Sequence, residues 1–297
     1  MPEAAVEIDR ISKRYAGTAV LTELSVRADA GQVVGILGGA RSGKTTALRI
    51  TAGLVDPDAG EVRIGGVPRN ERTRTMLGYL PQRRGLPDGV TVLDHLVHLA
   101  ELHAMATNDA HRAAEVQLAA FGLREVRSAH ARDLTDGERE RVLLAGALVH
   151  APTVLVCDEP FGEHAEQTAQ VLREHAERGG AVLVATGDTT AAQRFCDRVT
   201  ILHNGQSVAE GAVAELRAAG ATQVVVEMPD ARPGWAEGIP GVEVVAAEQG
   251  RTVLRLTGNT DDQVLLRMAM AAGRVRAFRS GEPTLADLFA PVLGSGS

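Results

Sequence analysis

A glycine-rich segment near residue 40 carries the clearest chemical signal of this chain. It consists of Gly38, Gly39, Ala40, Arg41, Ser42, Gly43, Lys44 and Thr45, and Thr46 follows it. A glycine, four residues and then Gly-Lys-Thr is the order of a loop whose backbone N–H groups surround a phosphate. In such a loop Lys44 would reach the terminal phosphates of a nucleotide, and the Thr45 hydroxyl would bind Mg²⁺. The spacing therefore predicts a nucleotide site.

A pair of acids further along the chain has the complementary chemistry. The apolar residues 154–157 lead directly into Asp158 and Glu159. Asp158 is placed to hold Mg²⁺, usually through water, and Glu159 is placed to polarise an attacking water. An acid after a strand is common by itself. Because this pair follows a phosphate loop, we interpret it as the second half of the same site.

The segments around these residues are expected to alternate between strands and helices. Apolar residues 33–37 run into the phosphate loop, and the short apolar runs 153–157 and 181–185 are typical of buried parallel strands. Residues 4–11, 20–27 and 61–67 alternate as strands do. Apolar spacing predicts helices over 92–104, 110–121, 138–150, 165–178 and 191–196. The order predicts an α/β fold with a helical subdomain over residues 83–150.

A third motif lies between the phosphate loop and the acid pair. It reads Leu134, Thr135, Asp136, Gly137 and Glu138. This segment resembles the signature of ATP-binding cassette (ABC) ATPases, usually written Leu-Ser-Gly-Gly-Gln. The resemblance covers residues 4–218. It implies a P-loop NTPase fold with a mixed sheet, ATP and Mg²⁺ as cofactors, and a signature that contacts the ATP of a second ATPase domain.

Two further residues fit the same family pattern. Tyr15 matches the aromatic residue that stacks on adenine, and Gln82 matches the glutamine that contacts Mg²⁺ and water and senses the membrane partner. By this resemblance Glu159 and Gln82 are the catalytic residues, and Thr45, Gln82 and Asp158 are the metal ligands. The family's ATPase domains work as head-to-tail dimers, and a homodimer is favoured here over a heterodimer.

The character of the sequence changes near Gly220. Strands are predicted over 224–226, 242–245 and 253–256, and a helix over 261–272. Residues 282–289 resemble the end of the C-terminal domain of one group of bacterial ABC exporters, whose ATPases serve drug, antibiotic or lipid permeases. We therefore predict a small α+β domain over residues 219–292 and a disordered tail over 293–297.

Four positions depart from the family pattern. Gly187 stands where the family has a histidine that contacts the γ-phosphate, and Asp136 replaces a signature glycine. Ala165 replaces an aspartate that couples the two sites, and Arg41 replaces a glycine of the phosphate loop. Losing one positioned donor typically lowers a rate by about 10²–10³-fold. We therefore expect firm ATP binding but slow hydrolysis for this family.

Composition excludes other classes of protein. The net charge is −7, from 31 basic and 38 acidic residues, and no domain-wide basic field points to nucleic acid. Two cysteines far apart suit a reducing cytoplasm. We expect no signal peptide and no membrane span, because no run of about 18 apolar residues occurs.

Together these features predict the ATP-binding subunit of an ABC exporter, working with a separate integral-membrane permease. We expect it in the cytoplasm, held peripherally on the inner face of the cell membrane by that permease. Two alternatives stay open at this point. One is a soluble ABC ATPase without a transport role, and the other is a regulatory subunit that binds ATP and scarcely hydrolyses it.

Overall fold

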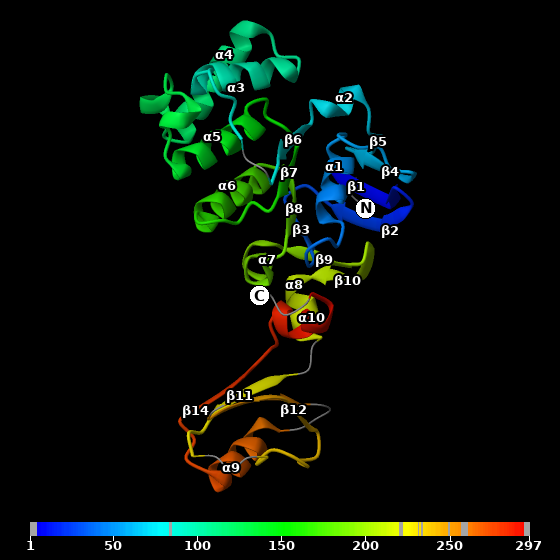
Figure 1. Ribbon diagram of the computed structural model, residues 1–297, viewed down its shortest axis with the longest axis vertical. Coiled ribbons are helices and arrows are strands. Elements are labelled where there is room, and N and C mark those ends of the chain that lie inside the picture. Colours follow the sequence, from blue (N-terminus) through cyan, green and yellow to red (C-terminus); the bar gives the residue numbers. More distant parts are fainter. Residues whose placement is uncertain are drawn as a thin grey trace. The chain divides into compact units, whose positions relative to one another are not determined.

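The computed structural model describes residues 5–82, 85–219, 222–230, 232, 234–248, 250–256 and 261–293 of the 297-residue chain. The chain forms two compact units (Figure 1). The first comprises Met1–Ala212 with Pro291–Ser297, and the second comprises Val213–Ala290. Residues 294–297 of the predicted tail lie outside the described residues. Among the described helices, none combines the length and the apolar character needed to cross a membrane.

A six-stranded sheet forms the centre of the first unit. Its order is β10-β9-β3-β8-β7-β6. The strands are β3 (Val33–Leu37), β6 (Leu77–Leu80), β7 (Val154–Asp158), β8 (Ala181–Thr186), β9 (Arg198–His203) and β10 (Gln206–Ala212). Five of them are parallel and β10 pairs antiparallel with β9, so the sheet is mixed as predicted. Because β3, β7 and β8 are neighbours, their carboxyl ends lie at the same edge of the sheet.

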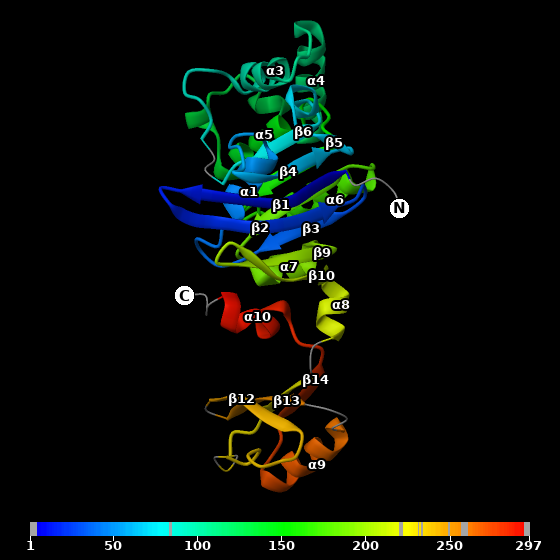
Figure 2. The ribbon, with the colours of Figure 1, turned by 90° about the vertical axis from the view of Figure 1, so that its right-hand side faces the viewer.

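A second, antiparallel sheet belongs to the same unit. Its order is β2-β1-β4-β5, and its strands are β1 (Val6–Tyr15), β2 (Thr18–Ala28), β4 (Ala59–Ile64) and β5 (Val67–Pro68). Figure 2 shows the long β1–β2 pair. Helix α1 (Lys44–Thr51) contributes Leu48 and Ile50 to one apolar core that also contains Ile8, Ile36 and Leu183. Both sheets therefore anchor the helix that follows the phosphate loop.

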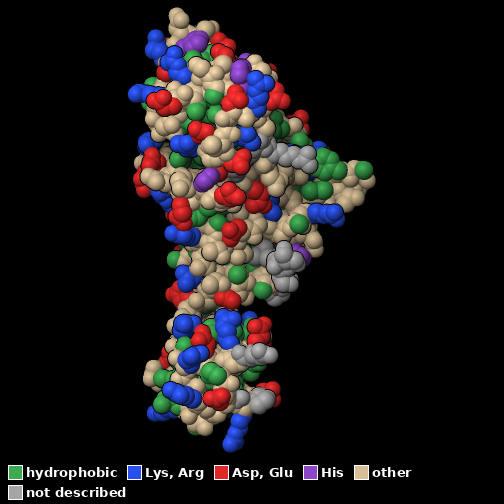
Figure 3. All heavy atoms as spheres, turned by 60° about the vertical axis from the view of Figure 1, so that its left-hand side comes forward, with side chains coloured by type: hydrophobic (Ala, Val, Ile, Leu, Met, Phe, Trp, Pro, Cys, Tyr) green, Lys and Arg blue, Asp and Glu red, His purple; other side chains and the backbone are tan. Residues whose placement is uncertain are grey.

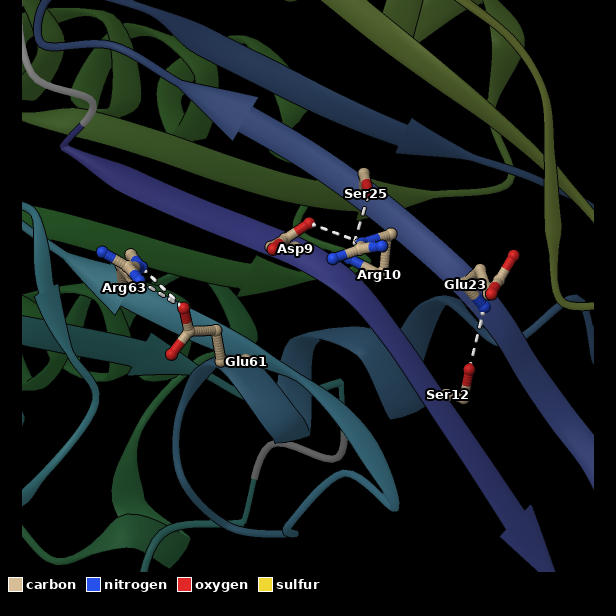
Figure 4. Close-up of polar contacts among 7 residues, drawn as sticks. All are labelled: Asp9, Arg10, Ser12, Glu23, Ser25, Glu61 and Arg63. Atoms are coloured by element: carbon tan, nitrogen blue, oxygen red, sulfur yellow. Dashed lines mark hydrogen bonds and ion pairs between the residues drawn. The ribbon is translucent and has the colours of Figure 1, made fainter.

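Two serine hydroxyl groups support irregular points in the β1–β2 pair. The register shifts along the pair, and Arg10 and Glu23 have φ values of 45° and 49°. The backbone N–H of Arg10 donates to Ser25 Oγ, and that of Glu23 donates to Ser12 Oγ, each at 3.0 Å (Figure 4). The side chains replace strand partners that the bulges remove, so the pair bends without unpaired backbone N–H groups at these points.

The helices between β6 and β7 have a core of their own. They are α3 (Val92–Leu102), α4 (Thr107–Ala120) and α5 (Asp136–Leu148), with short 3₁₀ turns at Arg124–Val126 and Ala131–Asp133. Leu96, Ala114, Leu118 and Val142 are fully buried in this core. A short helix, α2 (Glu71–Arg74), precedes β6. The predicted helical subdomain is therefore stabilised by a hydrophobic core of its own.

Helix boundaries differ from the predicted ones by up to three residues. Helix α4 begins at Thr107 rather than at residue 110, and α5 begins at Asp136 rather than at residue 138. The start of α5 is set by a capping box, in which Thr135 and Glu138 exchange hydrogen bonds. Helices α6 (Ala165–Glu177) and α7 (Thr189–Phe195) complete the first unit, and α8 (Val213–Ala218) begins the second.

The second unit, described by itself, is a four-stranded antiparallel sheet with a helix on it. The strand order is β12-β13-β11-β14, from β11 (Gln223–Glu227), β12 (Val242–Glu248), β13 (Arg251–Leu256) and β14 (Ala277–Gly281). Helix α9 (Asp262–Ala272) contributes Leu265 and Ala269 to the core. Helix α10 (Leu285–Leu293) follows β14. We did not predict β14, because its Ala-Phe-Arg-Ser-Gly sequence lacks a clear alternation.

Candidate functional site

Two glycines of the phosphate loop are required by close packing. A Cβ on Gly38 would lie 2.5 Å from Ser42 Oγ and 2.6 Å from the Leu202 carbonyl oxygen. A Cβ on Gly43 would lie 2.7 Å from Leu21 Cδ2, and this glycine has a φ of 108°. Contacts this short do not occur for real side chains, so both positions need glycine. The loop is therefore tightly wrapped between β3 and α1.

Arg41 is strained within this loop. Its φ is 63°, which places a non-glycine residue in the left-handed region, and its side chain is exposed. The left-handed conformation costs an ordinary residue about 1–2 kcal/mol. The backbone at this departure from the family pattern therefore favours glycine.

The ammonium group of Lys44 faces the backbone of the phosphate loop. The side chain is almost fully buried, and Nζ donates to the carbonyl oxygens of Gly38 at 2.7 Å and Gly39 at 3.1 Å. Nζ also lies 3.5 Å from Glu159 Oε1. Helix α1 begins at Lys44 without a side-chain cap, so its first N–H groups are directed at the loop. A buried cation beside uncapped N–H groups suits a phosphate.

One buried polar atom of the loop has no partner. Ser42 is 5% exposed, and its Oγ makes no hydrogen bond among the described residues. An unsatisfied buried hydroxyl is costly in a folded protein. A phosphate oxygen would accept a hydrogen bond from this hydroxyl. This atom therefore fits an anion in the loop and supports the predicted nucleotide site.

Thr45 and Asp158 meet where β7 ends. Thr45 Oγ1 donates to Asp158 Oδ1 at 3.2 Å. Asp158 is 1% exposed, and its Oδ2 has no hydrogen-bond partner among the described residues. Burial raises the pKa of Asp158, and the nearby Glu159 raises it further, against the Thr45 hydrogen bond and the charges of Lys44 and Arg49. A hydroxyl and a partly satisfied carboxylate are the oxygen ligands that suit Mg²⁺.

Glu159 is held from three sides. Its backbone has a φ of 48°, and its N–H donates to the Ala185 carbonyl oxygen at 2.8 Å. Its Oε2 accepts from the backbone N–H of Gly187 at 3.1 Å, and Oε1 faces Lys44. Strained backbone is common where a functional side chain must be aimed. Neighbouring strands thus hold the candidate water-polarising carboxylate beside the phosphate loop.

Position 187, where the family pattern has a histidine, has room for a larger side chain. A Cβ built on Gly187 would lie 3.6 Å from the Gly38 carbonyl oxygen and 3.8 Å from Glu159 Oε1, which are ordinary contacts. Asp188 caps α7 by accepting from the N–H groups of Thr190 and Ala191. The backbone around position 187 is therefore well supported, and packing at Cβ does not explain the glycine.

Two predicted residues stand apart from this cluster. Gln82 is exposed and follows the end of β6 by two residues. Within the part of the chain that the structure describes, it makes no hydrogen bond with Thr45 or Asp158. Tyr15 ends β1, is 43% exposed, and has Lys13 Nζ at 5.7 Å from its ring centroid. An exposed ring at a strand end is available for stacking, but the structure does not join it to the loop.

The signature forms the start of α5. Leu134 is buried, whereas the Asp136 side chain is 89% exposed and lies 3.4 Å from Arg139. Thr135 N donates to Glu138 Oε2 at 2.8 Å, and this backbone bond, followed by the Thr135 hydroxyl, lowers the pKa of Glu138. Gly137 leaves room for His164, whose Nε2 would be 3.0 Å from a Cβ there. The signature is thus an exposed helix start, with Glu138 used as a cap.

The sequence analysis did not predict two contributions to the site, one from Arg49 and one from Glu138. Arg49, one turn into α1, hydrogen-bonds to Tyr79 and acts electrostatically on Asp158. An exposed helix arginine gives no signal of that in the sequence. The capping role of Glu138 could have been found, because Thr-x-x-Glu before a helix is the pattern of a capping box.

Comparison with known proteins agrees with this geometry. Residues 21–162 match the ABC transporter family, and residues 211–292 match the C-terminal domain of DrrA1-3-like ATP-binding proteins. The Nod factor export ATP-binding protein I of Paraburkholderia xenovorans is 34% identical over 223 residues, covering 73% of each chain. The chain belongs to the ABC transporter ATP-binding family. The ABC protein of the same name from Rhizobium etli is 30% identical over 297 residues, covering 98% of this chain and 93% of that one.

Solved ABC cassettes share the fold. One is the ATP-binding subunit of an ABC transporter, with a TM-score of 0.65 and 26% identity over 72% of this chain and 92% of the other. Another is a dimeric cassette in a post-hydrolysis state with ADP and Pi, with a TM-score of 0.63 and 25% identity over 70% and 98% of the chains. The predicted family, the fold class and the assignment as an ABC ATPase that binds ATP are confirmed.

Proposed function

We propose that this chain is the ATP-binding subunit of an exporter and drives a separate membrane permease. The observation that carries the proposal is the meeting of Lys44, Thr45, Asp158 and Glu159 at one edge of the central sheet. Relatives that cover most of the chain are named for Nod factor export, and the second unit matches a DrrA-like domain. Because no described helix suits a membrane span, the permeation path would belong to another subunit, which would hold this one on the cytoplasmic face.

Each residue of the cluster has a distinct proposed task. Lys44 and the N–H groups of residues 38–45 bind the β- and γ-phosphates, and the Ser42 hydroxyl donates to one of them. Thr45 and Asp158 supply oxygen ligands for Mg²⁺, with Gln82 as a third candidate. The ion would neutralise the phosphate charge and relieve the burial of Asp158. Glu159 orients and polarises the attacking water.

The remaining site residues act at a dimer interface in this proposal. Tyr15 stacks on adenine, and the signature residues 134–138 of a second copy face the γ-phosphate. The capping box at the start of α5 already satisfies the N–H groups of Thr135 and Glu138, so the donors for such a role would be those of Asp136 and Gly137. A homodimer is the simplest assembly, since a dimeric cassette is among the solved relatives. Asp136 is then the unfavourable element, because its exposed carboxylate would face phosphate oxygens.

We further propose that hydrolysis is slow. Gly187 offers a backbone N–H to Glu159 but no side chain to the γ-phosphate, and Ala165 at the start of α6 has no carboxylate to offer a partner. One missing donor corresponds to about 10²–10³-fold in rate. The subunit would then hold ATP for long periods between turnovers.

The test is to measure nucleotide binding and turnover separately, with and without a membrane protein that co-purifies with this chain. We expect tight, Mg²⁺-dependent ATP binding, slow turnover that the permease stimulates, and loss of turnover in Glu159→Gln. Lys44→Ala should abolish binding while the chain stays folded. Binding without any turnover, even with the permease, would identify a regulatory subunit instead. Failure to co-purify with any membrane protein would contradict the transport role.

A further inference from the structure

Helices α5 and α6 contact each other at two levels near their first residues. At the first level His164 lies against Gly137, so that a Cβ built on Gly137 would be 3.0 Å from His164 Nε2. At the second level Thr168 Oγ1 donates a hydrogen bond to Glu140 Oε1 at 3.0 Å. On α5 the two residues are three positions apart, and at the start of α6 they are four apart, so each pair lies on one side of its helix. We call these four residues the α5–α6 contact.

The hydrogen bond of the α5–α6 contact is shielded from water. Thr168 is 1% exposed, and Glu140 is half-buried. A hydrogen bond to a carboxylate is stronger than one between neutral groups, and a buried hydroxyl that loses its partner destabilises the fold. The backbone N–H of Thr168 also donates to the His164 carbonyl oxygen at 3.0 Å, so the two levels are joined along α6. The contact therefore holds the starts of the two helices in one defined arrangement.

Beyond the α5–α6 contact, a cavity of about 890 Å³ lies between the two helices. Its wall includes Leu144 and Leu148 of α5 and Val171 and His175 of α6, and the four contact residues line it as well. Because the side chains further along the helices face this space, they do not interdigitate as they would in a packed core. The contact is therefore the tie that lies nearest to the two helix starts.

The α5–α6 contact joins two parts of the first unit that pack separately. Helix α5 buries Val142 and Ala145 in the core of the helical subdomain. Helix α6 packs instead toward β3 and β8 of the central sheet. Acidic and basic side chains are mixed on the surface of the helical subdomain, at the top of Figure 3, as is usual for a solvated outer face. A movement of the helical subdomain against the sheet would therefore act on this interior contact.

Each of the two helices begins beside a segment of the candidate site. Helix α5 starts within the signature residues 134–138, and α6 is separated from Glu159 by residues 160–164. In the dimer of the proposed function, on which this inference rests, the signature faces the ATP of the other copy, whereas Glu159 faces the ATP of its own chain. The α5–α6 contact therefore lies on the path through one chain between the two ATP sites.

We propose that Thr168 and His164 are positioning residues that couple the two ATP sites of the dimer. When the signature closes on the ATP of the other copy, α5 moves Glu140 and Gly137. The α5–α6 contact carries this movement to the start of α6 and so to Glu159. Coupling of binding is reciprocal, so ATP beside Glu159 also adjusts the signature for the other site. Without the contact each site binds ATP independently.

The cooperativity of ATP binding and turnover by the full chain tests the proposal. In the unaltered chain, ATP at one site should raise the affinity of the other by about 5–150-fold, as is typical of allosteric coupling. Thr168→Val keeps the shape of the side chain and removes the hydroxyl. This variant should bring the coupling factor and the Hill coefficient for turnover toward one, while the affinity of the first site stays unchanged. Thr168→Ser keeps the hydroxyl and should retain the cooperativity of the unaltered chain.

A double-mutant cycle and a matched control separate this role from a loss of stability. Thr168→Val should add nothing to the effect of Glu140→Ala, because the same hydrogen bond is already absent. His164→Ala should lower the coupling factor as well. Thr51→Val is the control, since Thr51 is fully buried and its hydroxyl donates to the Ala47 carbonyl oxygen within α1 at 2.9 Å. This control should lower the melting temperature but leave the cooperativity unchanged.

Three results would overturn this coupling role while leaving the proposed function in place. They are unchanged cooperativity in Thr168→Val, an equal loss of cooperativity in Thr51→Val, and two ATP sites that are already independent in the unaltered chain. Failure of the unaltered chain to bind ATP at all would contradict the proposed function and the coupling role together.

Discussion

The backbone N–H of Gly187 donates a hydrogen bond to the carboxylate of Glu159, with 3.1 Å between the nitrogen and Oε2. The carboxylate proposed to activate water is therefore positioned by an amide at the very residue where the family has a histidine. In the proposed site this amide positions the carboxylate, whereas the glycine has no side chain to offer the γ-phosphate.

Restoring the histidine should accelerate hydrolysis. In Gly187→His the new Cβ meets only ordinary contacts, at 3.6 and 3.8 Å. We expect turnover to rise by about tenfold or more, because one positioned donor is typically worth about 10²–10³-fold. Gly187→Ala is the control, since it adds a Cβ without a donor. Equal rates in the two variants would contradict the proposed cause of slow turnover.

Replacing Asp158 should separate stability from Mg²⁺ binding. Burial raises the pKa of Asp158 above its usual value of 3.8, so its contribution to stability is present below pH 3.8 and is lost as pH rises through the raised value. At neutral pH the metal-free Asp158→Asn variant should melt at a higher temperature than the unaltered chain. The same variant should lose the increase in melting temperature that Mg²⁺ adds to ATP. An unchanged Mg²⁺ effect would remove Asp158 from the proposed ligand set.

Relaxing the phosphate loop should stabilise the protein. Arg41 has a φ of 63°, which glycine adopts without strain. Glycine also increases the entropy of the unfolded chain, so the net gain in Arg41→Gly should be about 0.5–1 kcal/mol. Thermal unfolding of the nucleotide-free chain measures it. Arg127→Gly, at a residue whose φ is −54°, should instead destabilise.

Acid should lower the stability of the fold through the stacked rings of His103 and His150. The rings of His103 and His150 lie 3.5 Å apart between centroids with 3° between their planes, and His150 Nε2 lies 2.9 Å from the Leu77 carbonyl oxygen. Burial, and then His103, lowers the pKa of His150 to about 4, while burial and then Arg74 lower that of His103. Both rings are thus neutral when folded and gain protons more readily when unfolded.

The sign of the pH effect follows from these lowered pKa values. Stability is present above the unfolded pKa of 6.5 and is lost as pH falls from 6.5 toward about 4. At this half-buried site the loss should reach about 2 kcal/mol after solvent screening. Urea unfolding between pH 7 and pH 5 measures it, and His150→Gln should flatten the dependence. The exposed His98→Gln is the control; an equal flattening there would count against the stacked pair.

Local sequence determined the chemistry that depends on neighbouring residues. The phosphate loop, the acid pair and the signature could be recognised because each is a short run whose spacing is itself the functional requirement. The apolar runs behind them predicted a buried parallel sheet, and the family comparison confirms that fold class. The roles of individual site residues, including Gln82 and Tyr15, stay predictions.

Tertiary structure decided what depends on residues far apart in the chain. Three features arise only when β3, β7 and β8 lie side by side. They are the backbone strain at Arg41, the raised pKa of Asp158 and the hydrogen bond from Gly187 to Glu159. The exposure of Val264 and Met268 is of the same kind, because α9 carries apolar residues on two sides and only packing shows that Leu265 and Ala269 form the buried one. Apolar periodicity along a helix or strand shows which faces could be buried. Which element covers a given face is set by the fold.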